Sequence, residues 1–145
     1  MTRKAGYMSA LSITPANVIP SANAQYTHGR FALSAITAGQ PLYKTAAGLM
    51  APADANGVAP LNVVEGIAAN NAAAGQPVSY VTEDPALQIA ASGLTIGDTL
   101  ILGATPGDIA PDADCASGWF KTILGTVVSA TAINLKLLRT GVAKA

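Results

Sequence analysis

The sequence predicts an all-β fold, a small barrel or sandwich, and three observations point to it. From about residue 28, short apolar segments alternate with turns rich in Gly, Pro, Asn and Asp. Several segments alternate apolar and polar positions, as strands with one buried face do. One turn-and-strand unit also recurs further along the chain. At 145 residues, the chain has the length of one ordinary domain.

Residues 1–27 differ from the rest, because they show little periodicity. Pro15 and Pro20, with Ser and Asn around them, favour extended or turn backbone. We therefore interpret residues 1–27 as an extended N-terminal arm and residues 28–145 as the β-domain. Such an arm is ordered only where it packs on a surface, either that of a partner or that of its own domain.

The domain is expected to contain eight strand-forming segments between turns. In the last, Ile133, Leu135 and Leu137 face one way and Asn134 and Lys136 the other. In the first, Phe31 and Leu33 are the bulky residues of a half-buried strand. Residues 53–64 and 70–76 are expected to be loops, with at most one short helix. The strand segments are residues 29–37, 40–45, 62–70, 76–83, 87–92, 98–103, 120–130 and 133–140.

An internal pseudo-repeat is visible as two similar segments, at about residues 36–68 and 94–127. Ile36–Pro52 aligns with Leu94–Pro111, and the same offset of 58–59 residues pairs Val63–Ala68 with Thr122–Val127. A partial third copy is Ala73–Val81. Glycine permits a positive φ, and proline begins a strand where no donor is needed, so each unit is a turn followed by a strand. The matching pairs are Gly39 with Gly97, Gly48 with Gly107, and Pro52 with Pro111.

The composition favours a protein that works by binding other proteins. Half of the residues are hydrophobic, but alanine dominates and only 5% are aromatic, so the core of one copy is expected to be thin. Charged residues make up only 11%, far below the usual quarter. All eight acids lie between Asp54 and Asp114, where there is no Lys or Arg, and the eight bases lie on either side. Segregated charge of this kind can steer docking onto a complementary surface.

No constellation of residues predicts catalysis, a cofactor or a metal. The one histidine, His28, has no neighbouring acid or base that marks a catalytic role. Asp108, Asp112 and Asp114 could join Glu83 and Asp84 around calcium, but no EF-hand pattern is present, so no metal is assigned. The single cysteine, Cys115, excludes an internal disulfide and a Cys-based zinc site. No apolar run is long enough to span a membrane, and no basic cluster with aromatics indicates nucleic-acid binding.

The motifs of the domain resemble those of a family of small phage capsid-decoration, or cement, proteins. The resemblance covers about residues 28–138, and here "GTVV" replaces the usual "GxA" ending. The residues that carry it are Ala38-Gly39, Gly66-Ile67-Ala68, Ala73-Ala74-Gly75-Gln76, Gly93-Leu94 with Gly97-Asp98, and Leu124-Gly125.

The resemblance implies a β-barrel or β-tulip-like module on the outer surface of an icosahedral virion. Such a module binds the major capsid protein after the shell expands, bridges capsomers and packs against neighbouring copies of itself, as a trimer or a dimer. We expect the arm, Thr2–Tyr26, to add backbone pairing to the capsid protein. The residues expected to contact the capsid or other copies are Arg3, Lys4, Tyr7, Tyr26, Trp119 and Phe120.

Two other classes stay open on the sequence. A phage fibre or tail component would assemble with itself through the same strands, without a capsid. A secreted carbohydrate-binding β-module or a small hydrolase would need clustered exposed aromatics or paired acids, and the seven aromatics are scattered.

Overall fold

The computed structural model describes residues 13–89 and 94–144, and within them the fold is all-β. No α-helix is present in these residues, only two single 3₁₀ turns. The expectation of at most one short helix therefore agrees with the fold. The elements are η2 (Pro15–Asn17), β1 (Gln25–Phe31), β2 (Pro41–Lys44), β3 (Met50–Pro52), β4 (Gly66–Ala68), β5 (Pro77–Gln88), β6 (Thr99–Leu102), β7 (Ile109–Pro111), η3 (Asp112–Asp114), β8 (Phe120–Val127) and β9 (Ala132–Ala143).

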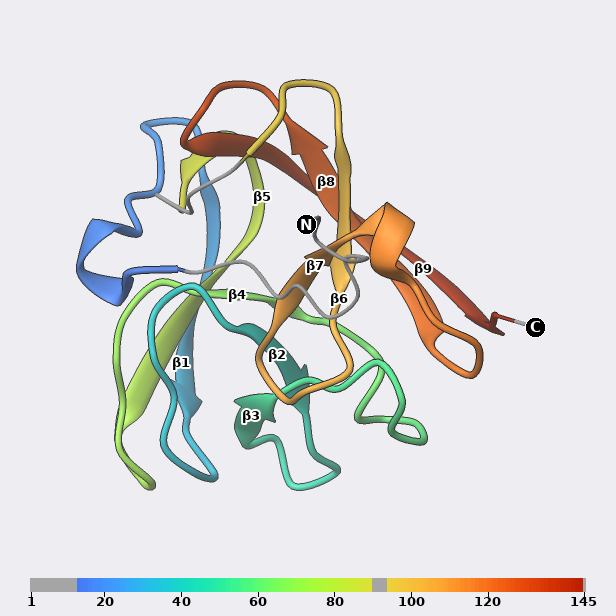
Figure 1. The fold of residues 1–145 in the computed structure, drawn as a ribbon. Helices are drawn as coiled ribbons and strands as arrows, with labels where there is room; N and C mark the ends of the chain where they lie inside the picture. The colour runs from blue at the N-terminus through green and yellow to red at the C-terminus, as the bar shows by residue number, and fades with distance from the viewer. Residues whose placement is uncertain (1–12, 90–93, 145) are drawn as a thin grey trace.

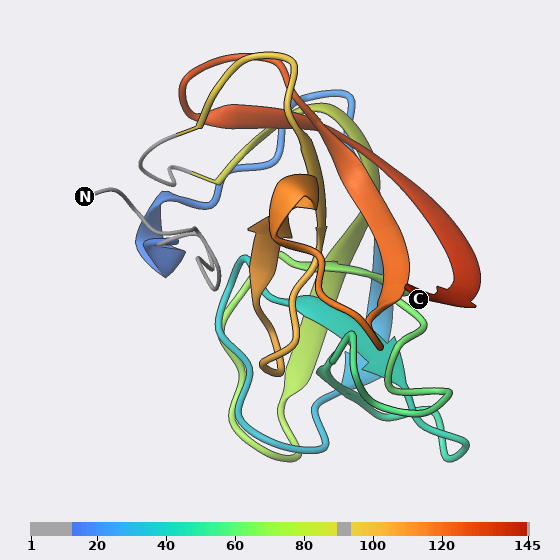
Figure 2. The same ribbon diagram turned by 45° about the vertical axis from the view of Figure 1, so that its right-hand side comes forward.

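The strands form one antiparallel sheet that curls into a half barrel (Figures 1 and 2). The strand order is β3-β2-β4-β5-β9-β8-β6-β7, and β1 also pairs with β5. Hydrogen bonds between loops join the two ends of the curl: Ala55 N–H donates to Gly103 O at 2.9 Å, and Gly107 N–H donates to Ala53 O at 2.8 Å. The long strands β5 and β9 pair at the centre of the sheet. They join a first half, β1–β5, to a second half, β6–β9, and each half contains a hairpin.

The pseudo-repeat of the sequence coincides with a repeat in the sheet. β2 and β3 form a hairpin, and β6 and β7 form the same hairpin 58–59 residues later. β2 then pairs with β4 through Leu42 and Gly66, while β6 pairs with β8 through Leu100 and Gly125. β4 then pairs with β5, and β8 pairs with β9. The order β3-β2-β4-β5 of the first half therefore corresponds, strand by strand, to the order β7-β6-β8-β9 of the second half.

Gly66 and Gly125 show why the repeat keeps a glycine at this place. A Cβ on Gly66 would lie 2.6 Å from Val81 O, and one on Gly125 would lie closer still to Asn134 O. Real Cβ atoms do not approach backbone so closely, so any side chain would push the neighbouring strand away. The two glycines therefore allow β5 and β9 to pack closely on the strand beside them.

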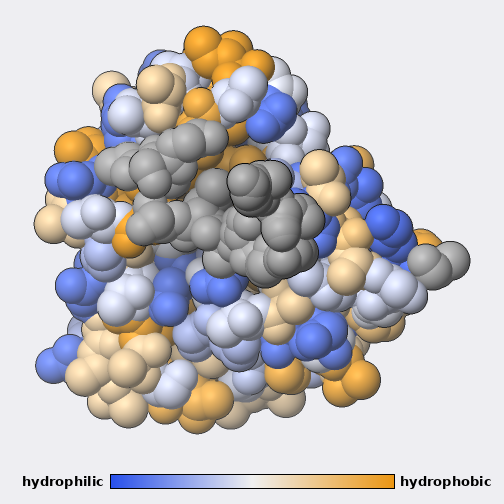
Figure 3. All heavy atoms as spheres, in the orientation of Figure 1, coloured by the Kyte–Doolittle hydropathy of each residue, from blue (hydrophilic) through white to orange (hydrophobic). Residues whose placement is uncertain are grey.

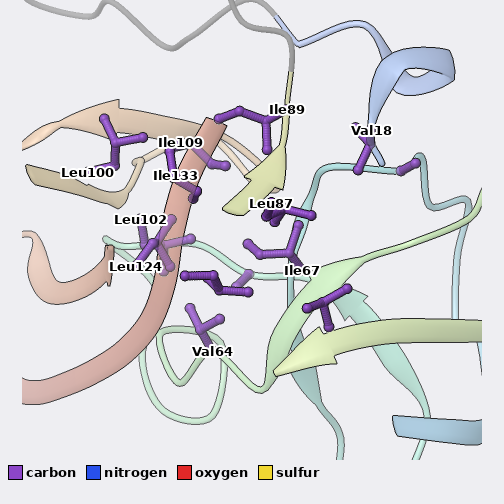
Figure 4. Packing of buried hydrophobic residues seen from close by; sticks show 14 of the residues in the cluster. Val18, Val64, Ile67, Leu87, Ile89, Leu100, Leu102, Ile109, Leu124 and Ile133 are labelled. Atoms are coloured by element: carbon purple, nitrogen blue, oxygen red, sulfur yellow. The ribbon is translucent and has the colours of Figure 1, made fainter. Parts of the chain in front are cut away.

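The main core lies inside the curl and receives side chains from both halves (Figure 4). Ile67 and Leu87 of the first half meet Leu102, Leu124 and Ile133 of the second (Figure 4). Twelve large side chains are fully buried among the described residues, in the main core and in two smaller clusters, despite the alanine-rich composition. The thin core expected from composition is not what the structure shows, because the few large aliphatic residues are concentrated on the inner face.

Residues 13–27 pack on their own domain rather than extending from it. Val18 is buried in the main core. Ile19 and Gln88 exchange two backbone hydrogen bonds, at 2.9 and 3.0 Å. β1 begins at Gln25 and pairs with β5, so the boundary placed between residues 27 and 28 falls within a strand. Of the two surfaces open to the arm, these residues use that of their own domain.

Two further differences from the expected strands have simple causes. Phe31 and Leu33 are exposed, and the residue between them, Ala32, is buried. Ala32, the residue after β1, forms a β-bridge with Met50 of β3. Because Ala32 faces inwards at this bridge, its neighbours Phe31 and Leu33 face outwards. The segments expected at 76–83 and 87–92 are not two separate strands, because β5 runs from Pro77 to Gln88. It continues through Pro85, where its pairing with β9 is irregular.

Candidate interaction surfaces

The outer face of β1 carries an exposed aromatic pair. Tyr26 and His28 lie two residues apart on the strand, and their rings stack with centroids 5.3 Å apart and planes 13° apart. Tyr26 is 44% exposed. Among the described residues, β5 is the only strand that pairs with Gln25–Phe31, so the other edge of β1 has no strand beside it. Tyr26 is therefore placed where a partner protein could reach it.

His28 has a hydrogen-bond partner that local sequence could not reveal. Its Nδ1 lies 2.7 Å from the Ser79 hydroxyl, and the two residues are 51 positions apart. A serine beside a histidine is the start of a nucleophile–base arrangement, but the second partner that orients the base is not seen among the described residues. The pair lies on the exposed surface, where it holds β1 to β5.

Apolar side chains are exposed at several separate places (Figure 3). Several of them belong to β1 or β9, or directly follow β1. On the side of β1 they are Tyr26, Phe31 and Leu33. On β9 they are Leu138 and Val142. Exposed apolar residues on strands suit contact with another protein better than single residues on loops, because the unpaired backbone of a strand edge can also hydrogen-bond to the partner.

Trp119 and Phe120, expected at an interface, are only partly exposed. Trp119 packs against the main core and against the small cluster of Ile101, Ala110 and Cys115. The backbone N–H of Phe120 donates to Ala55 O at 2.7 Å, which ties the start of β8 to the loop after β3. Both residues therefore contribute to their own domain. Arg3, Lys4 and Tyr7 lie outside the described residues.

The five acids considered for a calcium site do not come together as one group in the described residues. Asp84 is buried and receives hydrogen bonds from Ser21 and Ala86, while Asp112 lies 2.6 Å from Lys121 Nζ. The described part of the chain contains no group of three or more His, Cys, Asp or Glu placed to hold a metal.

Two ionisable side chains have altered pKa values. The hydrogen bond to Asp112 raises the pKa of Lys121. Burial raises the pKa of Asp108, which lies in the loop between β6 and β7. Cys115 is buried and unpaired with any other cysteine, as the only one in the chain.

Comparison with known proteins identifies no relative. No family model matches the sequence, and neither the curated proteins nor the solved structures contain a match. Within the described ranges, no helix has the length and apolar character needed to cross a membrane.

Proposed function

We propose that this protein is a structural component of a phage virion that binds the outside of the icosahedral capsid. In this role it bridges neighbouring major capsid proteins and stabilises the expanded head. The proposal rests on the resemblance of the motifs to capsid-decoration proteins.

The structural observation that best supports it is the exposure of apolar side chains on β1 and β9, combined with a charge content of only 11%. Tyr26 on β1 and Leu138 on β9 are exposed beside strand edges, where a second protein can add both apolar contact and backbone hydrogen bonds. Many copies on one shell would combine modest affinities at each site into strong clamping.

Co-sedimentation tests the proposal directly. Purified protein is mixed with expanded, undecorated phage heads and, separately, with unexpanded proheads, and the bound amount is measured against concentration. Saturable binding to expanded heads alone is the expected result. Binding to neither particle would overturn the proposal. If the protein then assembled with itself, the fibre or tail role would take its place, and glycan binding would favour a carbohydrate-binding module.

A further inference from the structure

The second half of β9 has a neighbouring strand on one side only. β9 pairs with β5 through Ala132–Lys136 and with β8 along nearly its whole length. From Leu137 to Ala143, no described strand lies on the side that β5 occupies further back. This part of β9 runs to the margin of the molecule, where the chain ends (Figure 1). We call Leu137–Ala143 the free edge of β9.

β5 is the strand of the first half that corresponds to β9, and an N-terminal segment lies beside its second half. On β5, Ile19 exchanges two backbone hydrogen bonds with Gln88, and Ser21 bonds the Asp84 side chain. An extended segment thus runs beside the second half of β5, whereas no segment of the described residues pairs with the corresponding side of the second half of β9. Leu138 is 57% exposed and Val142 is 65% exposed there. The free edge therefore combines unpaired backbone with two apolar side chains in water.

Positive charge predominates on and beside the free edge, where the nearest described acids are Glu83 on β5 and Asp112, which pairs with Lys121. Lys136, Arg139 and Lys144 lie on or next to it, and no acid occurs between residues 132 and 145. Lys136 reaches Glu83 only at 4.0 Å, and its side chain is 76% exposed. Lys144 Nζ donates to a neutral acceptor, Cys115 O, at 2.8 Å. Within residues 13–89 and 94–144, neither Lys136 nor Lys144 has a carboxylate closer than 4.0 Å, and an acidic partner would supply one.

A bulge sets the length of the regular edge. β8 advances two residues between Phe120 and Thr122 while β9 advances four, from Ala143 to Arg139, and Gly141 in the bulge has φ +68°. The bulge interrupts the ladder beyond Thr140. Beside it lies an open groove of about 460 Å³, whose lining includes Val142, Lys144 and the Lys121–Asp112 ion pair.

We propose that the free edge of β9 accepts an extended, acidic segment of a partner protein as an added strand. The inference deepens the proposed function and rests on it for the identity of the partner, the capsid protein. The added strand pairs with the backbone of Leu137–Thr140 and covers Leu138. Its acidic side chains lie near Lys136 and Lys144, and the end that passes the bulge lies over the groove.

Charge also decides against a second copy as the occupant of this edge. Antiparallel pairing of two free edges would bring Lys136 of one copy towards Lys144 of the other, and opposed like charges destabilise a strand pair. Arg139 lies between them in sequence and adds a third positive charge on each strand, although its Nε–H already donates to Val64 O at 2.6 Å. A segment of the opposite charge meets no such penalty.

The first experiment uses a fluorescein-labelled, end-capped octapeptide of alternating valine and glutamate. Fluorescence anisotropy with the full chain is expected to show saturable binding. An octapeptide of alternating valine and lysine is expected to bind at least about tenfold more weakly. Equal binding of the two peptides, or no binding of the acidic one, would overturn the inference.

Charge-reversed variants locate the binding site. The double variant Lys136→Glu, Lys144→Glu is expected to weaken binding of the acidic peptide by about tenfold or more. Lys44→Glu, on the distant β2–β3 hairpin, is the matched control and should bind as the original protein does. Hydrogen exchange should slow at residues 137–140 when the acidic peptide binds. If exchange slowed instead at the backbone amides of β1, the peptide would be adding to the open edge of β1, and the inference would be overturned.

Expanded heads separate failure of this inference from failure of the proposed function. If the protein binds heads and the double variant binds them equally well, the capsid role stands and the edge assignment is wrong. If the acidic peptide binds at residues 137–140 but heads do not bind, the edge accepts acidic segments and the capsid role is wrong.

Discussion

Ser21 donates two hydrogen bonds to the carboxylate of Asp84, a residue 63 positions away. The backbone N–H of Ser21 lies 2.8 Å from Asp84 Oδ2, and its hydroxyl bonds Oδ1. The N–H of Ala86 adds a third bond to Oδ1 at 3.0 Å. Asp84 is completely buried, so these bonds replace the water that a carboxylate needs. They hold the N-terminal segment on the second half of β5.

Asp84→Ala is expected to lower the free energy of unfolding by about 3 kcal/mol, because Ser21 loses both acceptors and the segment loses its attachment. Ser21→Ala removes one bond and should cost about 1–2 kcal/mol. Urea denaturation of both single variants and the double variant measures the coupling between the two residues. Ser34→Ala, at an exposed position, is the control. Fully additive effects would show that the two residues act independently.

Gly66→Ala and Gly125→Ala are each expected to destabilise the domain by about 2–4 kcal/mol, since the new Cβ would collide with backbone of the adjacent strand. Gly118→Ala is the control, because its φ is +90° but no atom lies within 4 Å of the position that a Cβ would take. It should cost only the backbone strain, about 1–2 kcal/mol. Thermal unfolding of the three variants tests this order. A Gly125→Ala protein as stable as Gly118→Ala would contradict the close approach of β8 and β9.

Asp108→Asn is expected to stabilise the protein at pH 7 and to have no effect well below pH 3.8, the usual pKa of the side chain. Burial raises the pKa of Asp108, so the folded protein binds more protons than the unfolded chain in the pH window between the usual pKa of 3.8 and the raised pKa of the folded state. The contribution of Asp108 to stability therefore falls as pH rises through this window. Melting temperatures of both proteins at pH 3 and pH 7 measure the change, with Asp98→Asn as the control. A larger benefit at pH 3 than at pH 7 would reverse the sign and contradict the prediction.

Tyr26→Ala is expected to weaken binding to expanded heads by about tenfold, because exposed tyrosines contribute strongly to protein interfaces. Loss of the stack on His28 should change the free energy of unfolding by less than about 1 kcal/mol. Co-sedimentation gives the first quantity and urea denaturation the second. Val58→Ala, which removes an exposed apolar side chain from a loop, should change neither. Unchanged head binding by Tyr26→Ala would exclude this face of β1 from the interface.

Removal of residues 2–26 is expected to destabilise the domain, because it deletes Val18, the Ile19–Gln88 bridge, Ser21 and the first residues of β1. A truncation of residues 2–12 keeps all of these contacts. If the arm binds the capsid, the shorter truncation abolishes head binding while circular dichroism shows the same fold. Full binding by the shorter truncation would exclude residues 2–12 from the capsid contact.

Much of the local structure could be predicted from the sequence. The alternation of Val78 and Tyr80 on β5, and of Ile133 and Leu135 on β9, corresponds to the buried positions of those strands. The repeated glycines mark equivalent turns, and Gly39 and Gly97 have φ values of 95° and 96°. Only glycine adopts such a φ without strain, so these turns depend on single residues rather than on distant contacts.

The candidate surfaces were harder to predict, because they depend on which strands become neighbours. Trp119 resembles an interface anchor in sequence but packs on Cys115 and the main core. Leu138 shares the face of Asn134 and Lys136, so its exposure agrees with the two-residue alternation, but only the strand pairing shows that the described part of the sheet leaves the edge beside it open.

The sequence by itself determined the all-β class, the turns and the repeat of about 58 residues, because each follows from local steric rules and from the two-residue period of a strand. Only the tertiary structure decided that residues 13–27 pack on β5, that His28 meets Ser79 and that half of β9 has a free edge. The first two features come from contacts between residues more than 50 positions apart, and the third depends on where β5 stops pairing with β9, so no local pattern specifies them.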